Sequence, residues 1–151
     1  MLVIPDFQSD GNLPAGVHDA FWSEFASRYG INPHRERLAS GLQRVLTILR
    51  QAGCTDAFVD GSYVTAKPLP RDYDAAWSMV GVDLVLLRSL EPILFDFTSG
   101  RAAQKAKFLG ELFPAEMQEG LSGRTFLNFF ETDRDTGQPK GIVRIGLRTL
   151  P

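Results

Sequence analysis

A Gly-Ser dipeptide followed by two closely spaced aspartates is the feature that most constrains this chain. The apolar run at residues 57–59 leads into Gly61 and Ser62; Asp72 lies ten residues after that serine, and Asp74 follows two residues later. Side chains two residues apart in a strand point to the same face, so Asp72 and Asp74 would both reach one divalent ion. A Gly-Ser turn at a strand end frees backbone N–H groups for an anion, and paired carboxylates hold Mg²⁺ or Mn²⁺. The stretch therefore predicts a place where phosphate and metal meet, as phosphoryl transfer requires.

Composition is typical of a globular protein and excludes several other classes. A chain of 151 residues is normally one domain, and its content of 44% hydrophobic and 23% charged residues argues against disorder. The single Cys54 excludes an internal disulfide and a Cys-rich zinc site, as is typical of a reducing cytoplasm. No apolar stretch approaches the ~20 residues of a membrane span, and Met1 to Asp6 lacks the basic region of a signal peptide. We therefore expect a cytoplasmic protein with no membrane segment, and the net charge of −2 predicts no broad attraction to nucleic acid.

The clearest predicted helix runs from about residue 33 to residue 52. Asn32 is a good N-cap, and Pro33 suits the first helical position. The apolar residues fall at offsets of 0, 4, 7, 8 and 11, which describes one stripe: Leu38, Leu42, Val45, Leu46 and Leu49. The arginines of this helix, among them Arg35, are expected on its solvated face.

The remaining pattern predicts an α/β (α+β) fold, in which helices flank a small mixed sheet. Residues 1–17 are predicted to form an irregular arm and residues 18–151 a single domain. Asp19 is expected to cap a short helix that buries Phe21, Trp22 and Phe25. Strands are predicted at 55–60, 71–77, 93–97 and 141–147, and further helices at 84–90, 100–109 and 124–131.

Several charged residues outside the Asp72 and Asp74 pair are candidates to complete a site. Asp96 lies in the predicted strand 93–97, where a carboxylate must be paired, bound to metal or near water. It is therefore either a third metal ligand or a carboxylate paired with an arginine. Ser99 is expected to cap the following helix, whose N-terminus would attract phosphates. Four residues are candidate phosphate contacts, with ordinary surface charge as the alternative for each: Lys67, Arg101, Lys105 and Lys140.

The order strand, Gly-Ser, about ten residues and Asp-x-Asp resembles the pattern of the nucleotidyltransferase superfamily. Gly61, Ser62, Asp72 and Asp74 carry the match. The wider sequence is similar to an uncharacterised bacterial family, a domain of unknown function with a nucleotidyltransferase-like core. That second resemblance is carried by LPAGVH at 13–18, DGS at 60–62, VTAK at 64–67, GRAAQK at 100–105, GELFPA at 110–115 and PKGIV at 139–143.

The superfamily resemblance implies a Mg²⁺-dependent site in which Asp72, Asp74 and Asp96 are the catalytic metal ligands. It also implies nucleotide binding by Gly61 and by Ser62, whose hydroxyl and backbone N–H would contact phosphate. Lys67, Arg101 and Lys105 are the basic residues expected to bind the nucleotide with them. The chain departs from many members in having Ala66 where they have a second glycine, and no separate acceptor-binding domain is expected after the core.

The leading expectation is therefore transfer of a nucleoside monophosphate from a nucleoside triphosphate to a hydroxyl on protein, RNA or a small molecule. The alternative is a non-catalytic interaction module of the same fold, such as one half of a toxin–antitoxin pair or a phage-defence component. The altered loop and the apolar arm motivate this alternative, which predicts a protein partner; a homo-oligomer is a further expectation. A metal nuclease using the same carboxylates is the third hypothesis, and the lack of a basic surface disfavours it.

Overall fold

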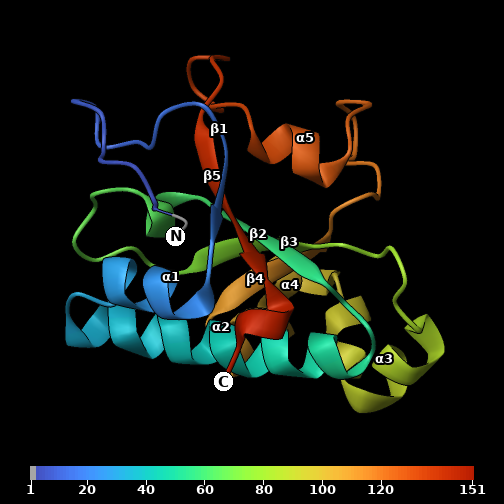
Figure 1. The fold of residues 1–151 in the computed structure, drawn as a ribbon. Helices are drawn as coiled ribbons and strands as arrows, with labels where there is room; N and C mark the ends of the chain where they lie inside the picture. Colours follow the sequence, from blue (N-terminus) through green and yellow to red (C-terminus); the bar gives the residue numbers. More distant parts are fainter. Residues whose placement is uncertain (1–2) are drawn as a thin grey trace.

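A five-stranded mixed sheet forms the centre of the fold in the computed structural model, which describes residues 3–151. Its strands are β1 (Gly16–Ala20), β2 (Asp56–Asp60), β3 (Tyr73–Trp77), β4 (Gly110–Pro114) and β5 (Gly141–Gly146). They lie in the order β1-β5-β2-β3-β4 (Figure 1). The outer pairs β1–β5 and β3–β4 are parallel, whereas β2 is antiparallel to both of its neighbours. The mixed α/β class predicted from the sequence is therefore confirmed.

In the described part of the chain, five helices accompany the sheet: α1 (Trp22–Tyr29), α2 (Pro33–Gln51), α3 (Leu84–Leu90), α4 (Thr98–Phe108) and α5 (Phe126–Phe130). Helix α2 confirms the prediction for residues 33–52, because the Asn32 side chain accepts a hydrogen bond from the Arg35 backbone N–H and Pro33 occupies the first turn. The Asp83 side chain caps α3 in the same way, through the Leu86 N–H. No helix among residues 3–151 combines the length and the apolar character needed to cross a membrane.

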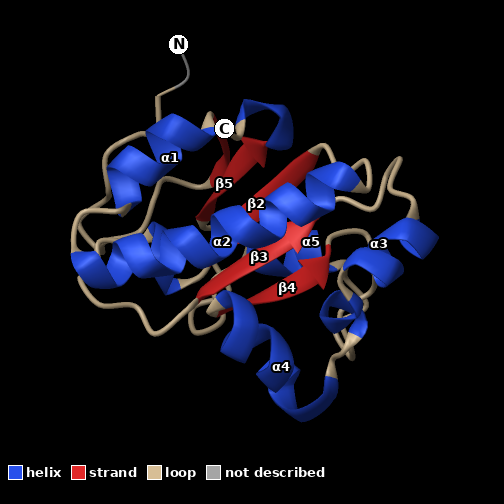
Figure 2. Cartoon of the chain, turned by 90° about the horizontal axis from the view of Figure 1, so that it is seen from below, coloured by secondary structure: helices blue, strands red, loops and turns tan. Residues whose placement is uncertain are grey.

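The two faces of the sheet differ in what covers them. Helix α2 lies across one face (Figure 2), and its stripe of Leu42, Val45, Leu46 and Leu49 is buried in the main core. The opposite face carries a smaller apolar cluster, to which α5 contributes Phe130. The strand residues of that cluster are Phe58, Ala76, Phe113 and Ile142. We call this second side the open face, because α5 is short and leaves both ends of the strands to polar residues.

The N-terminal arm packs on this body as its apolar residues predict. Ile4 and Leu13 are buried in the main core. Met1 and Leu2 of the predicted arm lie outside the described residues, and its last two residues belong to β1. Pairing with β5 therefore extends the sheet into a segment that the Pro and Gly content predicted to be irregular.

Four local predictions are wrong. Residues 93–97 do not form a strand; Pro92–Phe95 is a 3₁₀ turn, and the edge strand β4 lies later in the chain. Asp19 lies in β1 and does not cap α1, whose N-cap is Phe21. Trp22 and Phe25 are buried as predicted, but Phe21 is 48% exposed. Arg35 is only 1% exposed, whereas the sequence pattern predicts that it lies on the solvated face of its helix.

Candidate active site

Three carboxylates lie side by side at one end of the open face. Asp60 ends β2, and it pairs in register with Asp74 on β3. Asp74 in turn pairs with Glu111 on β4. Directly paired residues point to the same face with their Cβ atoms about 4.5–5.5 Å apart, so the three side chains form a row across the strands. Asp72, two residues before Asp74, shares this face.

These carboxylates line a cavity of about 510 Å³. Asp60, Asp72, Asp74 and Glu111 form its acidic wall. Its apolar wall is built from the β4 and α5 region: Phe113, Phe126, Phe129 and Phe130. Arg101 and Lys140 also line the cavity. The sequence prediction that Asp72 and Asp74 share one site is consistent with this placement, and Asp60 and Glu111 are additions to it.

The centre of the acidic row is short of positive charge. Burial raises the pKa of Asp74 to about 7, and the negative charges of Glu111, Asp60 and Asp72 add to the rise, which Lys140 opposes. The pKa of Asp72 is also raised, by burial and by Glu111, against the opposing charges of Lys105 and Arg71. A raised carboxyl pKa means that the site disfavours its own negative charge, so a bound cation would be stabilised there.

Two of the four carboxylates already have lysine partners. The Lys140 ammonium lies 3.0 Å from Asp60 Oδ1, and Asp60 is only 5% exposed. Burial still raises the pKa of Asp60, with Lys140 opposing it. The Lys105 ammonium lies 2.9 Å from Glu111 Oε1 at the outer edge of the row. Lys140 therefore lines the cavity and Lys105 lies at its edge, and each neutralises a carboxylate; the contact with phosphate that the sequence predicts for both remains a prediction.

Arg101 reaches the cavity from a distorted start of α4. Ser99, Gly100 and Arg101 all have left-handed backbone angles, with φ of 51°, 62° and 59°. Ser99 consequently does not cap the helix as predicted, and the ordered N-terminus proposed for phosphate does not form there. The Arg101 guanidinium lies 4.0 Å from the centre of the Phe113 ring. Its Nε is buried without a hydrogen-bond partner among the described residues.

Gly61 is required by the position of Asp74. Its φ is +80°, a conformation that favours glycine, and a Cβ atom there would lie 2.5 Å from Asp74 Oδ2. Ser62 begins a short 3₁₀ turn, and its carbonyl accepts a hydrogen bond from the Thr65 hydroxyl at 2.7 Å. The Asp74 carboxylate therefore lies against the glycine corner, whereas Gly61 and Ser62, which the sequence predicts to bind nucleotide, do not line the cavity.

The connection from Ser62 to Asp72 is held by the N-terminus of α2. The buried Arg35 guanidinium donates to the Tyr63 carbonyl at 2.7 Å and to the Thr65 carbonyl at 3.0 Å. It also donates to the Lys67 carbonyl at 3.1 Å, so it binds the carbonyl of every second residue from 63 to 67. This explains why Arg35 is buried: the loop supplies the acceptors that water would otherwise provide. The exposed Lys67 side chain is not brought into the cavity.

Asp96 is not brought together with Asp72 and Asp74. It follows the 3₁₀ turn that replaces the predicted strand, and its carboxylate accepts hydrogen bonds from the backbone N–H and the hydroxyl of Thr98. These bonds hold the pKa of Asp96 below its ordinary value. Asp96 therefore acts as a local turn cap, and the third carboxylate of the strand row is Glu111.

The arrangement of the carboxylates also limits how a metal would bind. Across residues 3–151, no three His, Cys, Asp or Glu side chains are placed to hold one metal ion together. The site thus lacks a preformed three-carboxylate cage. Mg²⁺ commonly binds through one or two carboxylates together with substrate phosphates and waters. The oxygen-only donors and the shortage of positive charge around Asp74 fit that second mode.

Comparison with known proteins identifies a family without adding an activity. The profile of a family of unknown function, DUF6932, matches residues 5–146. No curated protein and no solved structure gave a significant match.

Proposed function

The chain belongs to DUF6932, and we propose that it is a nucleotidyltransferase of the kind that its Gly-Ser and Asp-x-Asp motif resembles. The reaction would move a nucleoside monophosphate from a nucleoside triphosphate to a hydroxyl on a protein, RNA or small-molecule acceptor. One observation carries the proposal: Asp74, with a pKa raised to about 7, lies among three further carboxylates and against the Gly61 corner. Such a site is built to accept cations that accompany a polyphosphate.

The residues present would divide the work as follows. One or two carboxylates at a time, drawn from Asp72, Asp74 and Glu111, would hold each Mg²⁺ or Mn²⁺ together with phosphate oxygens and waters. The metal would neutralise the triphosphate and the departing pyrophosphate. Glu111 takes the place that the sequence assigned to Asp96, because it lies in register beside Asp74. Lys105 and Arg101, at the edge of the same row, would contact phosphate oxygens and replace part of the hydration that the phosphates lose in the cavity.

Asp60 and Lys140 have a different role in this proposal. The pair is less exposed than the pair of Lys105 with Glu111: the Asp60 and Lys140 side chains are 7% and 22% exposed, against 22% for Glu111 and 44% for Lys105. It sits beside Gly61 and the Asp74 carboxylate, so it would keep Asp74 directed toward the cavity without itself binding the nucleotide. The aromatic wall would exclude water from the reacting phosphate, which strengthens every charge interaction inside.

The experiment is to incubate the full chain with α-labelled ATP or GTP, Mg²⁺ or Mn²⁺, and an extract of proteins and RNA. Label should become bound to an acceptor, and Asp72→Asn and Asp74→Asn should each abolish the transfer because each removes a metal-binding oxygen. Label that persists in both variants would show that these aspartates do not perform the reaction.

A non-catalytic interaction module is the alternative, and one observation favours it. Lys140 and Lys105 already neutralise Asp60 and Glu111, so half of the carboxylates have partners within the chain. Calorimetry distinguishes the two hypotheses. Heat of binding for Mn²⁺ with a non-hydrolysable nucleotide supports the enzyme, whereas no such heat, together with a protein that copurifies, supports the module.

A further inference from the structure

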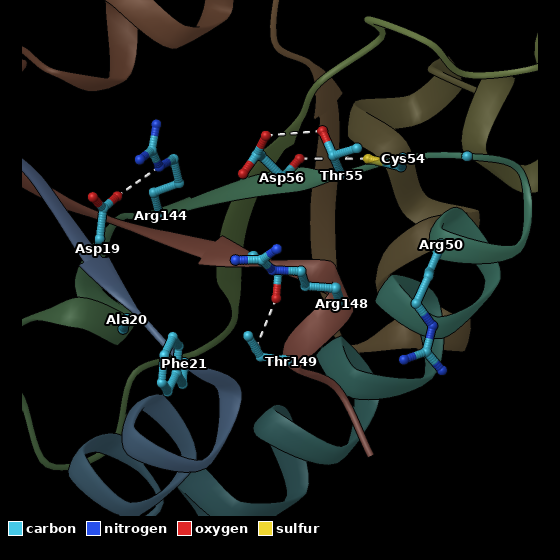
Figure 3. A pocket seen from close by; sticks show the side chains of 12 residues that line it. Asp19, Ala20, Phe21, Arg50, Cys54, Thr55, Asp56, Arg144, Arg148 and Thr149 are labelled. Carbon is cyan, nitrogen blue, oxygen red and sulfur yellow. Dashed lines mark hydrogen bonds and ion pairs between the residues drawn. The ribbon is translucent and has the colours of Figure 1, made fainter. Parts of the chain in front are cut away.

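A second cavity lies at the other end of the open face, away from the acidic row. Its volume is about 610 Å³, within the range of roughly 300–1,000 Å³ that holds small molecules. It is lined by the end of β1, the end of β5, the 3₁₀ turn Leu147–Thr149 and the segment Gly53 to Asp56 (Figure 3). Neither the Gly-Ser motif nor the Asp-x-Asp motif contributes to it.

The walls of this cavity are tied to one another by hydrogen bonds. The Thr149 hydroxyl accepts from the Trp22 backbone N–H at 2.9 Å and donates to the Gly146 carbonyl at 2.7 Å. The Leu147 N–H donates to the Thr55 carbonyl at 2.9 Å, which joins the 3₁₀ turn to the start of β2. The cavity is therefore preformed, so a ligand would not have to order its walls on binding.

Three arginines and two aspartates line the cavity, so its charged side chains carry a net charge of +1. Asp56 accepts a hydrogen bond from the Thr55 hydroxyl and has no arginine partner among residues 3–151. Arg50 points away from the space in Figure 3 and donates to the Leu150 carbonyl at 3.1 Å. Arg144 Nε lies 2.5 Å from Asp19 Oδ1, which leaves its two terminal nitrogens without a partner among residues 3–151. Arg148 has neither a hydrogen bond nor an ion pair with any described residue, and its side chain extends into the space between Arg144 and Phe21 (Figure 3).

Phe21 supplies an apolar surface next to these nitrogens. Its neighbours Trp22 and Phe25 are buried in the core, but Phe21 is turned outward to the cavity. An exposed aromatic ring beside an unpaired guanidinium offers both a stacking surface and a charged anchor. Ala20 and Cys54 continue the apolar wall.

From this juxtaposition we infer that the cavity is a second ligand site, for a small oxyanion carried on an aromatic ring. The guanidinium groups of Arg148 and Arg144 bind the oxyanion, and the Phe21 ring packs against the ligand ring. The oxyanion is a carboxylate or a phosphate, since both match the donor pair of a guanidinium. The site is independent of the proposed transferase activity, because it shares no lining residue with the acidic cavity.

The test is isothermal titration of the full chain with benzoate, phenyl phosphate, acetate and inorganic phosphate. Benzoate or phenyl phosphate should bind with one site per chain, and the tighter of the two identifies the oxyanion. Acetate and inorganic phosphate should bind at least about tenfold more weakly, since they lack the ring that contacts Phe21. Binding of the aryl anions no tighter than that of the matching simple anions would overturn the inference.

Variants locate the binding and separate it from folding. Arg148→Gln should weaken aryl anion binding by about tenfold or more, because it removes the unpaired charge. Arg37→Gln, an equal charge change at an exposed position on α2, should leave the affinity unchanged. Asp74→Asn should also leave the affinity for aryl anions unchanged, so failure of the transferase proposal and failure of this inference would give different results. Thermal unfolding checks that both proteins are folded. If Arg148→Gln then binds the aryl anions as tightly as wild type, Arg148 is not the residue that binds the oxyanion.

Discussion

The two ends of the open face carry opposite electrostatic problems. At one end Asp74 lies among Asp60, Asp72 and Glu111, and its pKa rises because the group is buried and because those carboxylates repel its negative charge. At the other end Arg148 faces a cavity without a carboxylate partner. Strand β2 contributes to both, through Asp60 and Asp56. One sheet thus presents a site that favours cations and a site that favours anions.

An apolar belt keeps these two ends apart. Phe58, Ala76 and Ile142 occupy the middle of the same face, under Phe130 of α5. Asp56 and Asp60 are four residues apart on one strand, which corresponds to about 13 Å at the usual rise. That separation exceeds the screening length of about 8 Å at physiological salt. The two ends therefore behave as independent sites, and mutations at one should leave the other unaffected.

The largest expected effect is on the rate of transfer, and it distinguishes Glu111 on β4 from Asp96, which the sequence predicts as the third metal ligand. If the proposed activity is measured by transfer of label, Glu111→Gln should reduce the rate by roughly 100-fold or more, since it removes a proposed metal oxygen. Asp96→Asn should stay within about twofold of wild type, because Asp96 does not line the cavity and its carboxylate is bonded to Thr98. A large loss of rate in Asp96→Asn with a small one in Glu111→Gln would show that Asp96, and not Glu111, belongs to the site.

The glycine corner should give the next largest effect, on stability. Gly61→Ala combines a positive φ with a Cβ only 2.5 Å from Asp74 Oδ2, and it should lower the free energy of unfolding by roughly 2–3 kcal/mol. Gly81→Ala is the matched control, because its φ is +78° and nothing lies within 4 Å of the added Cβ. It should cost only about 1 kcal/mol in urea unfolding. Equal costs for the two would mean that the Asp74 contact contributes nothing.

The acidic end should also make stability depend on pH. The pKa of Asp74 is about 7 in the folded chain and near 3.8 without the fold, so the folded state binds the extra proton between these values. Stability contributed by this group therefore falls as pH rises from about 4 to 7. At pH 8, Asp74→Asn should raise the free energy of unfolding by roughly 1–3 kcal/mol, and the gain should vanish near pH 4. Chemical unfolding at the two pH values tests this; a variant less stable than wild type at pH 8 would contradict it.

The smallest effect is expected at the opposite end. Asp19→Asn removes the ion pair with Arg144, which is largely exposed, so it should cost at most about 1 kcal/mol. The same change frees the Arg144 guanidinium and should strengthen benzoate or phenyl phosphate binding a few-fold. Unfolding in urea and titration of the aryl anions measure the two outcomes. A loss of several kcal/mol would mean that the pair holds the cavity together and does not merely limit its charge.

Sequence reasoning succeeded where the signal is local. The Asn32 cap and the apolar stripe of α2 are properties of one helix, and the alternation of Asp72 and Asp74 is a property of one strand. It failed at Glu111, although Gly110-Glu-Leu-Phe-Pro114 carries the same signal that was applied to Asp96: a carboxylate within a short apolar run. Five residues are too few for periodicity to distinguish a strand from a turn. Pairing with β3 made Gly110–Pro114 the strand.

Arg35 shows the same division between local and distant contacts. Its position on an otherwise polar helix face predicted exposure, but the loop that follows Ser62 folds over it and provides carbonyl acceptors. Those acceptors lie about thirty residues later in the chain. No pattern within the helix sequence predicts these carbonyl contacts.

The amino-acid sequence by itself determined the mixed α/β class, the long amphipathic helix and the pairing of a glycine corner with Asp72 and Asp74. These follow from spacing within single segments, where 3.6-residue and two-residue periods place side chains directly. Only the tertiary structure decided that Asp60 and Glu111 complete the acidic row, that Asp96 is excluded, and that Arg148 faces a cavity with Phe21. Those relations depend on strand register and on which segments pack together, and both are set by contacts between residues far apart in the chain.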